Sequence, residues 1–99
     1  GVGVAALING QQVAIFRLRD GSLRAIGNFD PFSGANVMSR GLVGSLKGLQ
    51  VVASPIYKQH FDLATGVCLE DESVTLPVYP VSERDGQIQV AAEAVPYAA

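Results

Sequence analysis

Turn-forming residues divide this 99-residue chain into short segments, and no other feature limits its fold more. Eleven glycines and five prolines interrupt nearly every window of twelve residues. Inside a helix each glycine costs roughly 1 kcal/mol and each proline about 3 kcal/mol, so no segment favours a helix. Three dipeptides that tolerate positive φ lie between apolar runs: Asn9-Gly10, Asp20-Gly21 and Asp85-Gly86. The sequence therefore predicts an all-β protein with at least three hairpins.

The apolar runs on either side of these turns predict the strands. We expect a first hairpin, a returning strand, a middle pair and a last hairpin, formed in that order by residues 3–7 with 12–18, 22–26, 49–53 with 60–63, and 78–83 with 87–91. Residues 27–47 show no such pattern and are expected to be irregular. A chain of this length supports one core, so we predict a single domain over residues 1–99, with small antiparallel sheets packed as a sandwich or partial barrel.

Composition excludes several functional classes. The net charge is −2 and the seven Lys and Arg are scattered singly, so we expect no nucleic-acid partner. No apolar run approaches the roughly 18 residues of a membrane span, and no secretory signal is recognisable, so we expect no membrane association and a cytoplasmic location. Cys68 is the only cysteine, which excludes an internal disulfide and metal sites that need several cysteines.

A few residues could carry chemistry, although each also has a simpler structural interpretation. His60 and Asp62 would lie on one face of a strand, where they could hydrogen-bond each other. With Ser54 or Ser33 they would complete a hydrolase triad, but triads are recognised by geometry, and a His60 far from both serines would exclude this one. Cys68 has no neighbouring cation to lower its pKa and is expected to be an apolar strand residue.

Two loops resemble a known iron–sulfur fold. The first is Gly27-Asn28-Phe29-Asp30-Pro31-Phe32; the second is Ser54-Pro55-Ile56-Tyr57, and a Thr65-Gly66 turn follows it. This layout resembles the Rieske-type ferredoxin domain, in which a C-x-H loop and a C-x-x-H loop supply two cysteines and two histidines to a [2Fe-2S] cluster. The resemblance implies a Rieske-like fold.

The resemblance also implies that all four cluster ligands are missing. The ligand positions fall at Asn28, Asp30, Ser54 and Tyr57. Iron bridged by sulfide is held by thiolates and imidazoles, which these four side chains together cannot replace. We therefore expect no cofactor and no catalytic residue in this chain. Stoichiometric iron with visible absorption would contradict that expectation.

Among Rieske-like proteins, the chain looks like the small subunit of assimilatory NAD(P)H-dependent nitrite reductase. The likeness rests on Asn-x-Asp-Pro-Phe-Ser at residues 28–33, on residues 39–44, and on residues 54–63. It implies a large catalytic subunit carrying FAD, an iron–sulfur cluster and siroheme, which takes electrons from NAD(P)H and reduces nitrite to ammonium. This chain would be a non-catalytic subunit of that oxidoreductase. The alternative is a stand-alone, cluster-free Rieske-like module that binds another protein.

In Rieske proteins the two loops meet at an exposed tip. Here the tip would carry six apolar or aromatic residues: Phe29, Pro31, Phe32, Pro55, Ile56 and Tyr57. Such clusters are typical of interaction sites, so one hypothesis is that they dock on the large subunit. The other is that they pack against one another where the cluster would be, while Asn28, Asp30 and Ser54 hydrogen-bond the loop backbones.

Overall fold

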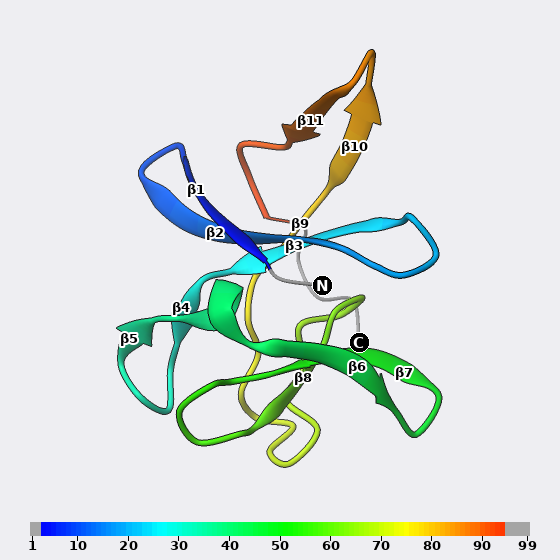
Figure 1. Ribbon diagram of the computed structural model, residues 1–99. Helices are drawn as coiled ribbons and strands as arrows, with labels where there is room; N and C mark the ends of the chain where they lie inside the picture. Colours follow the sequence, from blue (N-terminus) through cyan, green and yellow to red (C-terminus); the bar gives the residue numbers. More distant parts are fainter. Residues whose placement is uncertain (1–2, 95–99) are drawn as a thin grey trace.

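The structure is a computed structural model that describes residues 3–94, and within them it is built of strands and one short 3-10 helix (Figure 1). The elements follow in the order β1 (Val4–Ile8), β2 (Gln11–Arg17), β3 (Leu23–Gly27), β4 (Phe29–Asp30), β5 (Ala35–Asn36), η1 (Met38–Arg40), β6 (Leu42–Leu46), β7 (Leu49–Ala53), β8 (His60–Asp62), β9 (Val78–Tyr79), β10 (Val81–Arg84) and β11 (Gln87–Val90). The predicted all-β class is confirmed.

Two main sheets lie one above the other, and all strand pairs are antiparallel. The upper sheet has the order β1-β2-β3-β9 and the lower sheet the order β6-β7-β8. The β10–β11 hairpin projects above the upper sheet, and the small β4–β5 ribbon lies at one side (Figure 1). Neither main sheet closes on itself. This open stack of small sheets agrees with the predicted small antiparallel sheets packed as a sandwich or partial barrel.

The hairpin turns follow the predicted chemistry. Asn9 and Gly10 both have positive φ, at 49° and 79°, and Asp85 and Gly86 repeat this at 53° and 78°. Two consecutive residues with positive φ make the turn whose twist matches that of paired strands. The first and last hairpins therefore form in the expected registers, Ile8 opposite Gln11 and Arg84 opposite Gln87.

The prediction that residues 27–47 are irregular is wrong. They contain β4, β5, η1 and the whole of β6, which pairs with β7 through a turn at Lys47 and Gly48. Lys47 has φ 54°, a conformation that lysine rarely adopts, so its dipeptide gave no turn signal. The predicted strand 78–83 is also divided: β9 pairs with β3, and β10 begins after Pro80 to pair with β11.

The core lies between the two main sheets. Its largest buried side chains are Phe16, Ile26, Met38, Phe61 and Leu63. A smaller cluster of Val13, Ala25 and Tyr79 lies on the other face of the upper sheet, partly covered by Val81 and Val90 of the β10–β11 hairpin. Because both faces of β2 and β3 are covered, neighbouring residues such as Val13 and Ala14 are both buried.

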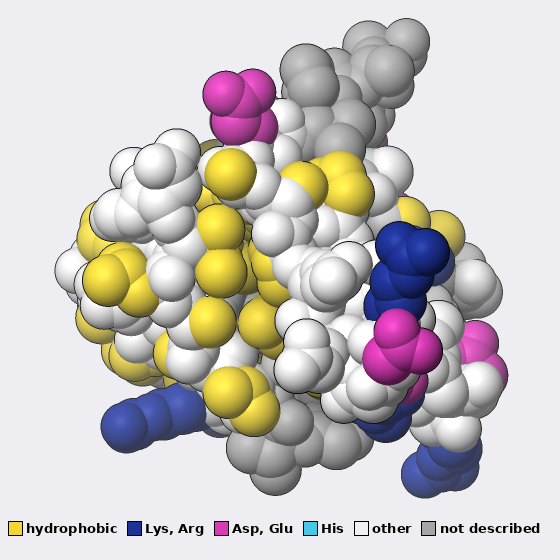
Figure 2. All heavy atoms as spheres, turned by 90° about the horizontal axis from the view of Figure 1, so that it is seen from above, with side chains coloured by type: hydrophobic (Ala, Val, Ile, Leu, Met, Phe, Trp, Pro, Cys, Tyr) yellow, Lys and Arg dark blue, Asp and Glu magenta, His cyan; other side chains and the backbone are white. Residues whose placement is uncertain are grey.

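The edge strand β1 is less well covered. Val4 and Leu7 are 65% and 73% exposed, and no charged residue lies between Val4 and Ile8. Seen from above, hydrophobic side chains remain visible on this side of the molecule (Figure 2). An uncharged apolar edge strand is a surface on which another chain can pair.

Candidate functional site

The two Rieske-like loops lie beside each other. The first runs from the end of β3 through β4 to β5, and the second connects β7 to β8. The direct link between them is a hydrogen bond from Ser54 Oγ to Asp30 Oδ2, 2.5 Å long, between residues 24 positions apart. The structure therefore brings three of the four predicted ligand positions, Asn28, Asp30 and Ser54, into one buried region.

Asn28 fastens the first loop to the body of the domain. Its side chain is 1% exposed; Oδ1 accepts a 2.7 Å hydrogen bond from the Ser39 N–H, and Nδ2 donates to Gln12 Oε1 at 3.1 Å. Its backbone also bonds to the backbones of Gln12 and Met38. One asparagine thus connects β2 and η1 to the start of the loop.

Asp30 is a fully buried carboxylate without a cation. Oδ1 accepts from the Phe32 N–H at 2.9 Å, while Oδ2 accepts from the Ser33 hydroxyl at 2.9 Å and from the Ser54 hydroxyl. In residues 3–94 the two ion pairs are Arg17–Glu83 and His60–Glu70, and neither involves Asp30. Three donors therefore take the place of a counter-ion.

These donors determine the ionisation of Asp30. Burial by itself would raise the pKa of this carboxyl, because a charged group loses its hydration. The hydrogen bonds from Ser54, Phe32 and Ser33 favour the charged form more strongly, so the pKa of Asp30 lies below its ordinary value of 3.8. Asp30 is a carboxylate at neutral pH.

Ser54 and Tyr57 have opposite environments. Ser54 is fully buried; its Oγ accepts from the Ile56 N–H at 3.3 Å, and its backbone bonds to Gln59 and Lys58. Tyr57 is 60% exposed. The fourth predicted ligand position is therefore a surface residue.

The six predicted tip residues do not share one environment. Phe32 is partly buried and packs against the core, with its ring centroid 6.2 Å from that of Phe61. Phe29 and Ile56 are 49% and 44% exposed, and Pro31 is also exposed. Pro55 is intermediate. Phe32 thus follows the packing alternative, whereas the other aromatic and aliphatic side chains remain partly on the surface.

The residues at the four positions do not fit a [2Fe-2S] cluster. They offer an amide, a carboxylate, a hydroxyl and a phenol, none of them the thiolate or imidazole that such clusters take. The Asp30 and Ser54 oxygens are also joined by a hydrogen bond. Within residues 3–94 no group of three or more His, Cys, Asp or Glu could hold a metal ion.

The predicted His60–Asp62 hydrogen bond is wrong. His60 Nδ1 lies 2.8 Å from Glu70 Oε2, and the His60 N–H donates to Glu70 Oε1 at 2.7 Å. Asp62 instead accepts from the Ala64 N–H in the turn after β8. Burial would raise the pKa of Glu70, but the bonds from His60 outweigh it and hold the pKa below its usual range. The sequence did not identify Glu70 because it reaches His60 from a separate loop.

Without a His60–Asp62 hydrogen bond, the predicted Ser-His-Asp triad of a hydrolase is not formed. The Ser54 hydroxyl donates to Asp30, and the Ser33 hydroxyl donates to the same carboxylate. No hydrogen bond in the described part of the chain joins His60 to either serine. Both serine hydroxyls therefore serve to hold Asp30 and are not paired with a histidine base.

Cys68 is a core residue, as predicted. It is fully buried and opposes Phe61 in a short antiparallel bridge. Burial raises the pKa of its thiol, so the thiol form predominates at neutral pH.

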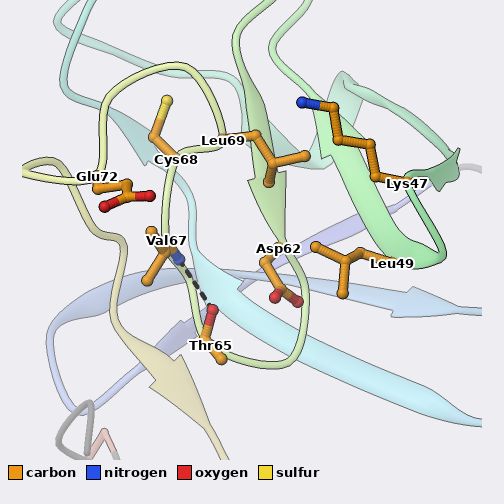
Figure 3. Close-up of a pocket in the computed structure, with 8 residues that line it drawn as sticks. All are labelled: Lys47, Leu49, Asp62, Thr65, Val67, Cys68, Leu69 and Glu72. Atoms are coloured by element: carbon orange, nitrogen blue, oxygen red, sulfur yellow. Dashed lines mark hydrogen bonds between the residues drawn. The ribbon is translucent and has the colours of Figure 1, made fainter. Parts of the chain in front are cut away.

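A depression of about 540 Å³ lies between the β6–β7 turn and the segment after β8, and Figure 3 shows its lining. Lys47 and Leu49 line one side, and the remaining lining residues are Asp62, Thr65, Val67, Cys68, Leu69 and Glu72. The Thr65 hydroxyl accepts from the Val67 N–H, and Asp62 caps its own turn. The depression contains none of the four ligand positions. Its one thiol, Cys68, lies 3.7 Å from Glu70 Oε1, but burial raises the pKa of that thiol and keeps it protonated.

The structure contains no helix in residues 3–94 that is long and apolar enough to cross a membrane.

Residues 1–91 match the family of the Rieske-like [2Fe-2S] domain. The nitrite reductase (NADH) small subunit of Salmonella typhimurium is 46% identical over 91 residues, which cover 91% of this chain and 84% of that protein.

A longer protein contains a similar segment. The nitrite reductase [NAD(P)H] large subunit of Klebsiella oxytoca is 36% identical over 88 residues, which cover 89% of this chain but 9% of that protein.

Solved structures agree. A Mycobacterium tuberculosis protein assigned as an NADH-dependent nitrite reductase small subunit superposes with a TM-score of 0.91 at 57% identity, covering 96% of this chain and 86% of that one. The ferredoxin of carbazole 1,9a-dioxygenase from Nocardioides aromaticivorans shares the fold, with a TM-score of 0.79 at 24% identity, covering 94% of this chain and 86% of that one. The chain belongs to the Rieske-like [2Fe-2S] domain family and, within it, to the small subunits of NAD(P)H nitrite reductase.

Proposed function

We propose that this chain acts as the non-catalytic small subunit of assimilatory NAD(P)H nitrite reductase and binds the large catalytic subunit. The observation that carries the proposal is the Klebsiella protein, a large subunit that includes a segment similar to 89% of this chain. When a domain is a separate chain in one organism and part of its partner's chain in another, the two are expected to work in contact.

The chemistry of the loops supports a non-catalytic role. The oxygens of Asp30 and Ser54 are bonded to each other and to neighbouring donors, and the only cysteine is a buried thiol. Electron transfer from NAD(P)H and nitrite reduction to ammonium would then belong to FAD, iron–sulfur and siroheme centres on the large subunit. In this proposal residues 1–99 form one cofactor-free domain that acts in the cytoplasm.

The proposed contact surface is the exposed part of the two-loop tip. Phe29, Pro31, Ile56 and Tyr57 are exposed and uncharged, and Pro55 is half-buried. Aromatic side chains of this kind contribute large contact areas at protein interfaces. Phe32 is left out of this surface because it packs against Phe61.

The test is co-purification with a siroheme-containing nitrite reductase large subunit, followed by nitrite-dependent NAD(P)H oxidation with and without this chain. We expect a stable complex at micromolar concentration, and loss of activity or of enzyme stability when the chain is omitted. A large subunit that neither binds the chain nor responds to it would contradict the proposal and favour a stand-alone binding module.

A further inference from the structure

We propose that Asp30 is the positioning residue of the two-loop tip: its buried carboxylate joins the loops that a metal cluster joins in cluster-bearing members of the fold. This inference deepens the proposed function and rests on it only where partner binding is measured. The family is named for a [2Fe-2S] domain, yet in this chain Asp30 and Ser54 are joined in a hydrogen-bonded network, and Asn28 bonds separately to Gln12 and Ser39.

The local part of this network is ordinary. Asp20 accepts from the N–H and hydroxyl of Ser22, and Asp71 does the same with Ser73. Asp30 likewise accepts from the Phe32 N–H and the Ser33 hydroxyl. Turns of this kind form wherever Asp precedes a suitable donor, so they do not explain why Asp30 is buried.

Two features distinguish Asp30 from the other two aspartates. Asp20 and Asp71 are exposed, whereas Asp30 is completely buried, where an unpaired charge is strongly unfavourable. Asp30 also accepts a bond from a second loop, through the Ser54 hydroxyl. Hydrogen bonds to a charged group are shorter and stronger than neutral ones, which suits Asp30 to hold two loops together.

The network continues from the core to the surface. Asn28 holds the first loop to β2 and η1, and Asp30 holds it to the second loop. The backbone of Ser54 bonds to Lys58 and Gln59, which closes the second loop. Ile56 and Tyr57 lie within this span and are exposed. Their position relative to Phe29 therefore depends on the Asp30–Ser54 bond.

A matched pair of variants separates the joining of the loops from the local turn. Ser33→Ala and Ser54→Ala each remove one hydroxyl from the same Asp30 oxygen, but only Ser54→Ala breaks the link between loops. The readout is amide hydrogen exchange at Gly34, which bonds to the Asp30 carbonyl, and at Lys58, which bonds to the Ser54 carbonyl.

We expect each change at the link to loosen the opposite loop. Ser54→Ala accelerates exchange at Gly34, and Asp30→Ala accelerates exchange at Lys58, by about tenfold in each case. Ser33→Ala leaves Lys58 unchanged. Asp30→Asn restores much of the protection lost in Asp30→Ala, because its amide can keep a bond between the loops by donating to the Ser54 oxygen, the reverse of the wild-type direction. If Ser33→Ala and Ser54→Ala gave the same pattern, or if neither change crossed to the other loop, the proposal would be overturned.

Binding to the large subunit gives the second readout. We expect Ser54→Ala and Asp30→Ala to weaken binding by about tenfold through faster dissociation, with Asp71→Asn as a control that alters an exposed turn of the same type. If the wild-type chain failed to bind, the proposed function would fall while the exchange result would still test the link. If the loops loosened but affinity was unchanged, the positioning role would be wrong.

Discussion

Single side chains account for how the tip keeps its shape without a metal centre. Asn28, Asp30 and Ser54 are short polar residues whose oxygens and amides reach nearby backbone groups. Asp30 has a further role because its carboxylate is buried and ionised at once. The hydrogen bonds to Asp30 favour its ionised form, so the stability that they contribute depends on pH.

The depressed pKa of Asp30 predicts the direction of that dependence. A group with a lower pKa in the folded state adds stability above its unfolded pKa and loses it as the pH falls through the folded value. The difference in unfolding free energy between wild type and Asp30→Asn should be largest at neutral pH, about 1 to 3 kcal/mol, and should shrink below the ordinary value of 3.8.

Urea unfolding of both proteins at a series of pH values from neutral to strongly acidic measures this difference. Asp71→Asn is the control, since it removes a carboxylate from an exposed turn. A wild-type advantage that stayed constant into strong acid would contradict the assignment of a low pKa to Asp30.

At the scale of elements, turns with positive φ place the strands and the loops. Gly66 ends the turn after β8 with φ 80°, and a Cβ added there would clash with the Leu76 carbonyl oxygen. Gly86 in the β10–β11 turn has nearly the same φ, 78°, but has no atom within 4 Å of that position. Comparing substitutions at the two glycines therefore distinguishes the cost of the backbone conformation from the cost of a steric clash.

We predict that Gly66→Ala destabilises the protein far more than Gly86→Ala. The conformational part should cost about 1 kcal/mol in both, because alanine tolerates this φ poorly. Gly66→Ala must in addition displace the Leu76 backbone, for a total of about 3 kcal/mol or more. Chemical denaturation measures both, and equal losses would show that the chain around Leu76 yields easily.

The sequence predicted the elements wherever the turn residues were distinctive. Asn9-Gly10 and Asp85-Gly86 fixed two hairpins, whereas Lys47-Gly48 gave no signal and β6 was missed. At the site, the resemblance suggested four ligand positions, and one of the two alternatives drawn from the sequence had Asp30 and Ser54 hydrogen-bond the loop backbones, as they do. The sequence did not reveal the Asp30–Ser54 bond or the His60–Glu70 pair, because contacts between separate loops depend on how the sheets pack.

For the whole molecule, two exposed apolar surfaces compete as the contact with the large subunit. One is the tip, with Phe29 and Tyr57; the other is the edge strand β1, with Val4 and Leu7. The edge offers unpaired backbone groups and flexible aliphatic side chains. The tip offers aromatic side chains on loops that a buried network holds in place, so less conformational entropy is lost on binding.

This comparison favours the tip and leads to a test with paired double variants. Replacing Phe29 and Tyr57 with serine should weaken binding to the large subunit by about 2 kcal/mol or more, while the unfolding midpoint changes little because Phe29 is 49% and Tyr57 60% exposed. Replacing Val4 and Leu7 with serine removes a similar exposed apolar surface and should leave affinity nearly unchanged. Titration calorimetry with the isolated large subunit measures both. The reverse result would place the interface at the β1 edge, where strand pairing would supply the contact, and a loss of folding stability without a change in affinity would make the tip residues part of the packing.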